Sequence, residues 1–138
     1  MNILYHAHSG VRYLVILVAL AALVALGYGL STGRGVKRAF TLAALFTGVL
    51  DLQILLGIGL VIGGIFPDIV IGHFVMMVIA AGVTHGSGII GRRSKTERRE
   101  VIVRLCGITL ALLIIAGGIM ALGRGVLSAA PMTPTSPG

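Results

Sequence analysis

Charge is scarce in this sequence. Only 11% of its 138 residues are charged and only four are acidic, whereas 57% are hydrophobic. About a quarter of the residues in a typical soluble domain are charged, so this composition excludes an ordinary soluble fold and indicates a bilayer as the solvent. We expect a single membrane domain.

Cysteine and the common catalytic motifs are also lacking. The one cysteine, Cys106, lies inside an apolar run and has no partner for a disulfide or a thiolate metal site. The chain has no phosphate-binding glycine loop, no Ser, His and Asp set in a plausible chain context and no metal motif with characteristic spacing. We therefore predict that the protein is not an enzyme, with no catalytic residues and no dedicated metal site.

The long segments without charge predict the architecture. Apolar runs reach the ~20 residues that a helix needs to cross ~30 Å of hydrocarbon, and they show no period-two alternation. The sequence predicts an all-α bundle of four transmembrane helices at about residues 5–30, 39–66, 69–91 and 101–123. These helices form one domain over residues 1–125, followed by a Pro-, Ser- and Thr-rich tail over 126–138.

The basic residues predict the orientation. The net charge of +7 would suggest a nucleic-acid partner in a soluble protein, but here the bases gather in the two loops STGRGVKR and RRSKTERRE between apolar runs. By the positive-inside rule both loops are cytoplasmic, and both termini lie on the extracytoplasmic side. We expect the lipid bilayer, not nucleic acid, as the partner.

Glycine is abundant, with 21 residues, and it indicates close helix packing. In the second predicted helix, Gly48, Gly59 and Gly63 share one face, and the last two form a GxxxG pair. In the third, Gly82 and Gly86 form another such pair. We expect all five to mediate contacts between helices.

The polar side chains within the predicted spans include Asp51, Gln53 and His85. Asp51 falls near the middle of the second helix, where an ionised carboxylate costs ~3 kcal/mol on insertion scales. It shares a face with Gly48 and Gly59, so we expect it to point into the bundle, either as a hydrogen-bonded neutral carboxyl or in a proton relay or beside a cofactor. Gln53 lies ~160° around the same helix and is expected to face another protein or lipid. His85 lies at nearly the depth of Asp51.

Histidines near the N-terminal end of the bundle suggest a cofactor site. If the first helix begins near Tyr5, His8 lies at the depth of His73, Arg12 shares the face of His8, and His6 points almost oppositely. Two imidazoles at one level can ligate a haem b, and an arginine can pair with a propionate. The same geometry suits a magnesium-centred pigment or a metal ion with a third ligand. A simpler interpretation is that these residues cap and anchor the first helix.

The segments HAHSGVRYLVIL, LDLQILLGIGL, GHFVMM and ALGRGV together resemble a family of small four-helix bacterial membrane proteins labelled "cytochrome b"-like. The resemblance spans nearly the whole chain. It implies a multi-pass protein of the bacterial inner membrane with a haem-binding or electron-transfer accessory role, carried by His6 or His8 and by His73.

Three functions follow from these observations. The first is a small accessory or scaffolding subunit of a respiratory or photosynthetic electron-transfer complex, with or without haem and with other membrane subunits as partners. The second is a free-standing b-type cytochrome with haem between the first and third helices. The third is a small proton-coupled transporter built around Asp51 and His85.

Overall fold

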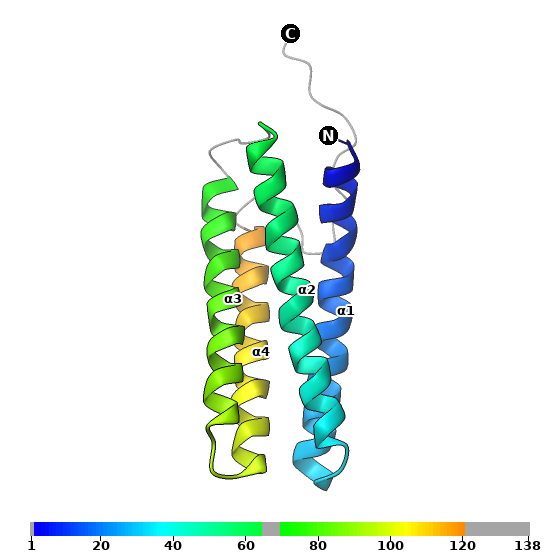
Figure 1. Cartoon of the computed structure of the whole chain (residues 1–138), viewed down its shortest axis with the longest axis vertical. Helices are drawn as coiled ribbons and strands as arrows, with labels where there is room; N and C mark the ends of the chain where they lie inside the picture. Colours follow the sequence, from blue (N-terminus) through cyan, green and yellow to red (C-terminus); the bar gives the residue numbers. More distant parts are fainter. Residues whose placement is uncertain (1, 65–69, 121–138) are drawn as a thin grey trace.

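The computed structural model describes residues 2–64 and 70–120, and this part of the chain is entirely helical apart from short turns (Figure 1). Its helices are α1 (Asn2–Thr32), α2 (Val36–Ile62), α3 (Val70–Arg92) and α4 (Glu97–Met120). Each is long and apolar enough to span a membrane, which confirms the predicted all-α, four-span, multi-pass architecture. The predicted C-terminal tail, and the predicted ends of the helices at residues 66, 69 and 123, lie outside the described residues.

Glycines end the helices at the turns that the structure describes. Gly33 and Gly35 adopt left-handed φ angles of 68° and 71°, which lets the chain reverse between α1 and α2 within three residues. At the other end of α2, the N–H of Gly63 donates to the carbonyl of Gly59 at 3.0 Å, and Gly64 is left-handed with φ 83°. Gly63 therefore caps α2, whereas we expected it to pack against another helix.

The bundle consists of two helical hairpins. α1 packs mainly on α2 and α3 mainly on α4, while α1–α4 and α2–α3 contacts are sparser (Figure 1). α1 and α3 are diagonal, and their described residues make no backbone contact. The largest fully buried side chains are Leu26, Phe46, Leu50 and Val101, so each hairpin contributes to a shared apolar core.

The closest helix contacts form at glycines that the sequence analysis did not single out. A Cβ on Gly107 of α4 would collide with Ser87 of α3, and a Cβ on Gly118 would lie 3.0 Å from the Cβ of Met76. These positions explain the tight pairing of α3 with α4, because only a residue without a side chain allows such an approach.

Three of the expected packing glycines have no such role within the chain. A Cβ built on Gly48, Gly82 or Gly86 would meet nothing within 4 Å, so the prediction that they mediate contacts between helices of this bundle is wrong. Gly59 does face a neighbour, since its Cβ would lie 3.7 Å from Leu4 of α1. A glycine pattern indicates where a backbone can approach, but not whether the approaching helix belongs to the same chain.

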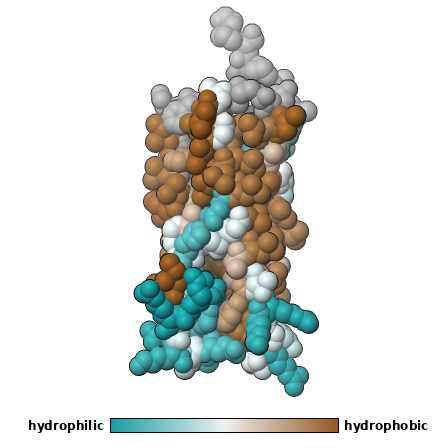
Figure 2. Space-filling model, viewed as in Figure 1, coloured by the Kyte–Doolittle hydropathy of each residue, from teal (hydrophilic) through white to brown (hydrophobic). Residues whose placement is uncertain are grey.

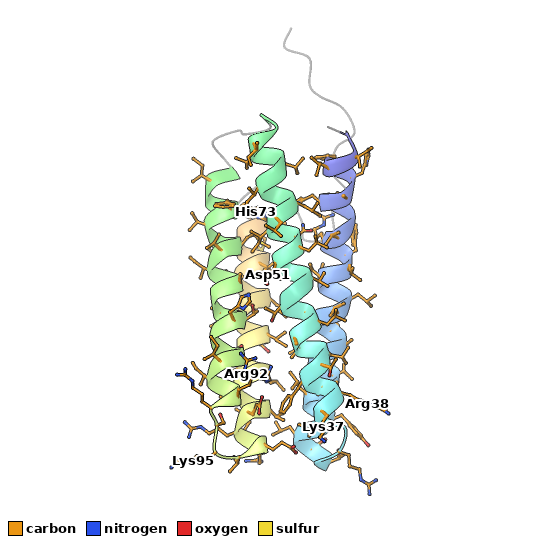
Figure 3. The ribbon with its side chains drawn as sticks, viewed as in Figure 1. Lys37, Arg38, Asp51, His73, Arg92 and Lys95 are labelled. Carbon is orange, nitrogen blue, oxygen red and sulfur yellow. The ribbon has the colours of Figure 1, made fainter. Side chains whose placement is uncertain are left out.

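The two ends of the bundle differ in polarity. Lys37, Arg38, Arg92 and Lys95 lie at the end opposite His73 (Figure 3), and that end is hydrophilic over the visible face (Figure 2). Between the ends the surface is mostly apolar, with large side chains such as Leu55 (63% exposed) and Val24 (73% exposed) facing outward. An apolar girdle of this kind indicates contact with a lipid bilayer.

Candidate functional site

A cavity of about 110 Å³ lies in the half of the bundle that holds the N-terminal end of α1. All four helices line it, and α4 contributes only apolar side chains. Its polar and sulfur-bearing lining comes from the other three helices and includes His8, Ser9 and Arg12 of α1, Gln53 of α2, and His73 and Met77 of α3. His8 and His73, which we expected at one level on different helices, therefore face the same space.

Gln53 holds His8 in place. The amide nitrogen Nε2 of Gln53 donates to the backbone carbonyl of His8 at 3.0 Å, and Nδ1 of His8 lies 3.2 Å from the backbone carbonyl oxygen of Gln53. A carbonyl oxygen can only accept, so Nδ1 carries the hydrogen, and Nε2 accepts from the Gln53 amide nitrogen 3.3 Å away. The imidazole packs on Gly57, whose Cβ would lie 3.3 Å from Cε1 of His8.

Two buried polar atoms in this region have no hydrogen-bond partner among the described residues. They are Oε1 of Gln53, whose residue is 5% exposed, and Nδ1 of His73. Nδ1 of His73 lies beside the backbone of Gly118 without a hydrogen bond of standard geometry. A buried polar atom without a partner costs about 1–3 kcal/mol, so Oε1 of Gln53 favours a ligand or ordered water in the cavity, whereas Nδ1 of His73 faces the backbone of Gly118.

The charge of the cavity is positive. Arg12 contributes its guanidinium, which donates to the Tyr13 hydroxyl at 2.9 Å and stacks 4.8 Å from the centre of that ring. Arg12 and His73 are both close enough to His8 to act on it electrostatically, and no acidic side chain belongs to the described lining. The cavity therefore favours a ligand that carries negative charge.

His6 has no part in this cavity. Its side chain is exposed and stands edge-on to the Tyr5 ring, with 6.0 Å between ring centres. Residues two apart on a helix point in nearly opposite directions, so only one of the two histidines could face inward. The structure selects His8.

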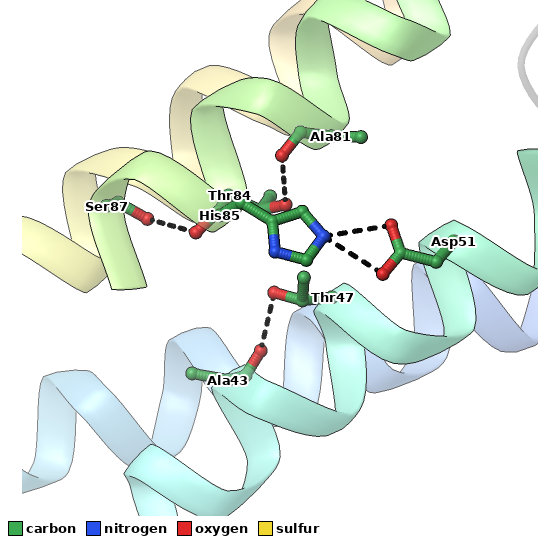
Figure 4. Close-up of polar contacts among 7 residues, drawn as sticks. All are labelled: Ala43, Thr47, Asp51, Ala81, Thr84, His85 and Ser87. Carbon is green, nitrogen blue, oxygen red and sulfur yellow. Dashed lines mark hydrogen bonds and ion pairs between the residues drawn. The ribbon is translucent and has the colours of Figure 1, made fainter. Parts of the chain in front are cut away.

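Asp51 and Gln53 are placed the opposite way from our expectation. Gln53 is buried inside the bundle, whereas the side chain of Asp51 is 40% exposed at the α2–α3 surface. The expected angle between Asp51 and Gln53 around α2 was correct. We expected the face with Gly48 and Asp51 to be the inward one, but a Cβ on Gly48 would meet nothing within 4 Å. Asp51 instead pairs with His85, whose Nε2 lies 3.0 Å and 3.1 Å from its two carboxylate oxygens (Figure 4).

Hydroxyl groups lie near this ion pair but are engaged within their own helices. Thr47, Thr84 and Ser87 donate to the backbone carbonyls of Ala43, Ala81 and Thr84, respectively, at 2.9–3.2 Å (Figure 4). Backbone bonds of this kind are ordinary for Ser and Thr in apolar helices. They do not extend the Asp51–His85 pair into a hydrogen-bonded chain.

Comparison with protein-family models, with curated proteins and with solved structures found no match for this chain. Within the described residues, no group of three or more His, Cys, Asp and Glu side chains is arranged to hold a metal ion.

Proposed function

We propose that the protein is a small integral-membrane subunit of an electron-transfer complex and that it holds one haem between α1 and α3. The observation that carries the proposal is that His8 and His73 face one cavity from two helices that have no backbone contact with each other. Two imidazoles on different helices that line one space could together hold a haem iron.

The residues around the cavity fit a haem. Nδ1 of His8 donates to a backbone carbonyl, which is the usual second bond of a metal-ligating histidine and leaves Nε2 for the iron. The Gln53 amide, now 3.3 Å from that nitrogen, would have to turn aside. Arg12 supplies a cation for a propionate. When bound, the haem would supply one-electron redox chemistry, and the protein would supply ligation and a positively charged surrounding.

The size of the cavity means that haem binding would require the helices to move. At about 110 Å³ it is smaller than the ~300–1,000 Å³ of pockets that enclose drug-sized ligands, so a porphyrin would have to part the α1–α2 and α3–α4 hairpins. The sparse contacts between the hairpins favour such a movement. Assembly with haem should therefore stabilise the relative position of the hairpins.

Spectroscopy of the purified protein tests the proposal. In mild detergent, the reduced-minus-oxidised spectrum should show a sharp α-band with about one iron per chain, and His8→Ala and His73→Ala should each remove most of it. His6→Ala is the matched control, because it removes an imidazole two residues from His8 but outside the cavity. A spectrum without the band, or an equal loss in the control, would refute haem binding.

A smaller metal centre is a second candidate, and the size of the cavity favours it. His8, His73 and the thioether of Met77 line the same space, and two imidazoles with a thioether suit copper. The nearby Arg12 opposes a bare cation. Metal analysis of the purified protein separates the two candidates, since copper without iron or an α-band would replace haem by this centre.

The basic end gives the proposed orientation. Lys37 and Arg38 in the first turn of α2 and Lys95 between α3 and α4 lie at that end, so we propose that it faces the cytoplasm of a bacterial inner membrane. The cavity then lies near the extracytoplasmic surface, within reach of a redox partner on that side. Recovery of the protein in a native complex with redox subunits would support the subunit role, whereas purification without such subunits would contradict it.

A further inference from the structure

The Asp51–His85 pair is exposed where a membrane protein rarely exposes charge. Its side chains remain 40% and 57% exposed, respectively, although Asp51 lies half-way along the bundle (Figure 3). Figure 2 shows hydrophilic surface at this height within the apolar girdle of the same face. A carboxylate at the bilayer centre costs about 3 kcal/mol on insertion scales, and such groups almost always face protein or water. One copy of the bundle leaves the pair against acyl chains.

Small residues border the ion pair on both helices. Gly48 precedes Asp51 by three residues and Gly82 precedes His85 by three, so each glycine is about one helical turn from a member of the pair. A Cβ on either glycine would meet nothing within 4 Å. Because α2 and α3 run antiparallel, the glycines lie on opposite sides of the pair along the membrane normal. They leave room for the backbone of another helix.

We propose that this face of α2 and α3, defined by Gly48, Asp51, Gly82 and His85, is the contact surface for a second copy of the chain. The two copies are related by a two-fold axis along the membrane normal. This inference concerns a different face from the haem cavity and does not depend on the proposed function.

The polar groups of this face can pair with the same groups on a second copy. Among the described residues, His85 contacts Asp51 through Nε2, and no further hydrogen bond is made by its Nδ1 or by the carboxylate. Asp51 and His85 are in contact and therefore at one depth, and a two-fold axis along the normal brings the second pair to the same depth. Nδ1 of each histidine can then donate to the carboxylate of the other copy. A different subunit would need a matching polar pair of its own, whereas a second copy has one already.

Cysteine cross-linking in native membranes tests the contact. In a Cys106→Ser background, a short thiol-reactive linker should join Gly48→Cys chains into dimers several-fold more efficiently than Leu20→Cys chains. Leu20 is the matched control, because it is 53% exposed on α1 and therefore equally accessible on another face. Absence of dimers from Gly48→Cys, equal yields at both positions, or cross-linking of Gly48→Cys to a different protein would overturn the proposal.

Two further variants separate the contact from folding. Gly82→Leu should lower the Gly48→Cys dimer yield several-fold by steric block, while Gly10→Leu should not, and neither has a neighbour within 4 Å of its Cβ in one copy. Asp51→Asn should also lower the yield, and the charge-swapped variant Asp51→His with His85→Asp should restore it. Unchanged yields in Gly82→Leu and Asp51→Asn, with normal helicity and elution, would overturn the self-pairing.

Discussion

At the scale of single residues, Gln53 joins α1 to α2 through both its backbone and its side chain. Its carbonyl accepts from Nδ1 of His8, its amide nitrogen donates to the His8 carbonyl, and its remaining oxygen is buried without a described partner. A buried amide that makes several bonds restricts the rotation of α1 against α2. The orientation of His8 therefore depends on a residue of another helix.

Replacing Gln53 by Leu should destabilise the bundle. The change removes the donors to the backbone carbonyl and the ring of His8 inside an apolar environment, and we expect the free energy of unfolding to fall by about 1–3 kcal/mol. Denaturant titration in detergent, followed by circular dichroism, measures this. Leu55→Ala, on the exposed face of the same helix, should change little. Equal stability of Gln53→Leu and the parent protein would contradict the role of this amide.

The placement of Asp51 and Gln53 shows how much the sequence could tell at this scale. Helical spacing gave their opposite directions, and the positions of His8 and His73 at a common cavity also followed from helix depth. The inward face did not follow, because the small residues near Asp51 serve equally well for a neighbour within the chain or outside it. The choice between His6 and His8 depends on the rotation of α1, which its contacts with α2 and α4 fix.

Gly57 provides the space for the His8 ring, and its substitution tests the proposed haem site. A Cβ there would lie 3.3 Å from Cε1 of His8, so Gly57→Ala should displace the imidazole by a few tenths of an ångström. We expect less haem per protein, measured from the α-band and the protein absorbance. Gly59→Ala is the control on the same helix, since its Cβ would make an ordinary 3.7 Å contact with Leu4. Equal haem content in both variants would show that the ring tolerates the shift.

At the scale of helices, the α3–α4 pair depends on the contact between Ser87 and Gly107. A Cβ on Gly107 would collide with both Cβ and Oγ of Ser87, which are too near the backbone to turn away. The sequence did not reveal this contact, because Gly107 has no glycine at GxxxG spacing and the segment around Ser87 contains several glycines. Only the crossing point of the two helices distinguishes them.

The variant Gly107→Ala should force α3 and α4 apart and lower the free energy of unfolding by about 1–3 kcal/mol. The double variant Ser87→Gly with Gly107→Ala should recover part of this loss, because it removes the colliding atoms. Gly10→Ala should be neutral or slightly stabilising, since its Cβ meets nothing and alanine favours the helix. Denaturation of the three variants in one detergent compares them. If stability does not recover in the double variant, the collision with Ser87 is not the cause of the loss in Gly107→Ala.

The start of α4 is fixed by a buried charge that the sequence analysis did not identify. Arg104 is 7% exposed, donates to Oε1 of Glu100 at 2.6 Å and 2.9 Å, and lies with its guanidinium carbon 4.8 Å from the centre of the Phe40 ring. A basic residue near a helix end ordinarily indicates the membrane interface. Its burial follows from packing against Phe40 of α2, which residue spacing within α4 cannot reveal.

Removing the carboxylate should leave this guanidinium buried without compensation. We expect Glu100→Ala to cost about 3–5 kcal/mol of stability, and the double variant Glu100→Ala with Arg104→Leu to recover most of it, because the unpaired charge is then absent. Thermal unfolding in detergent measures both. A single variant as stable as the parent would indicate that water reaches Arg104.

At the scale of the whole molecule, the cavity and the Asp51–His85 pair lie in different parts of the bundle. The cavity with His8 and His73 lies among all four helices in the half that holds the start of α1. The Asp51–His85 pair links α2 to α3 on the outer surface, near the middle of the bundle. Both lie where the two hairpins meet, and contacts there are sparser than contacts within each hairpin.

The orientation of the whole bundle can be tested with single cysteines in a Cys106→Ser background. Ile3 is 84% exposed near the start of α1, and Ser94 lies in the loop between α3 and α4 at the basic end. If that end is cytoplasmic, a membrane-impermeant maleimide should label Ile3→Cys in spheroplasts with an intact inner membrane and Ser94→Cys only after that membrane is permeabilised. The reverse pattern would place the cavity on the cytoplasmic side, and a redox partner would then have to approach His8 and His73 from there.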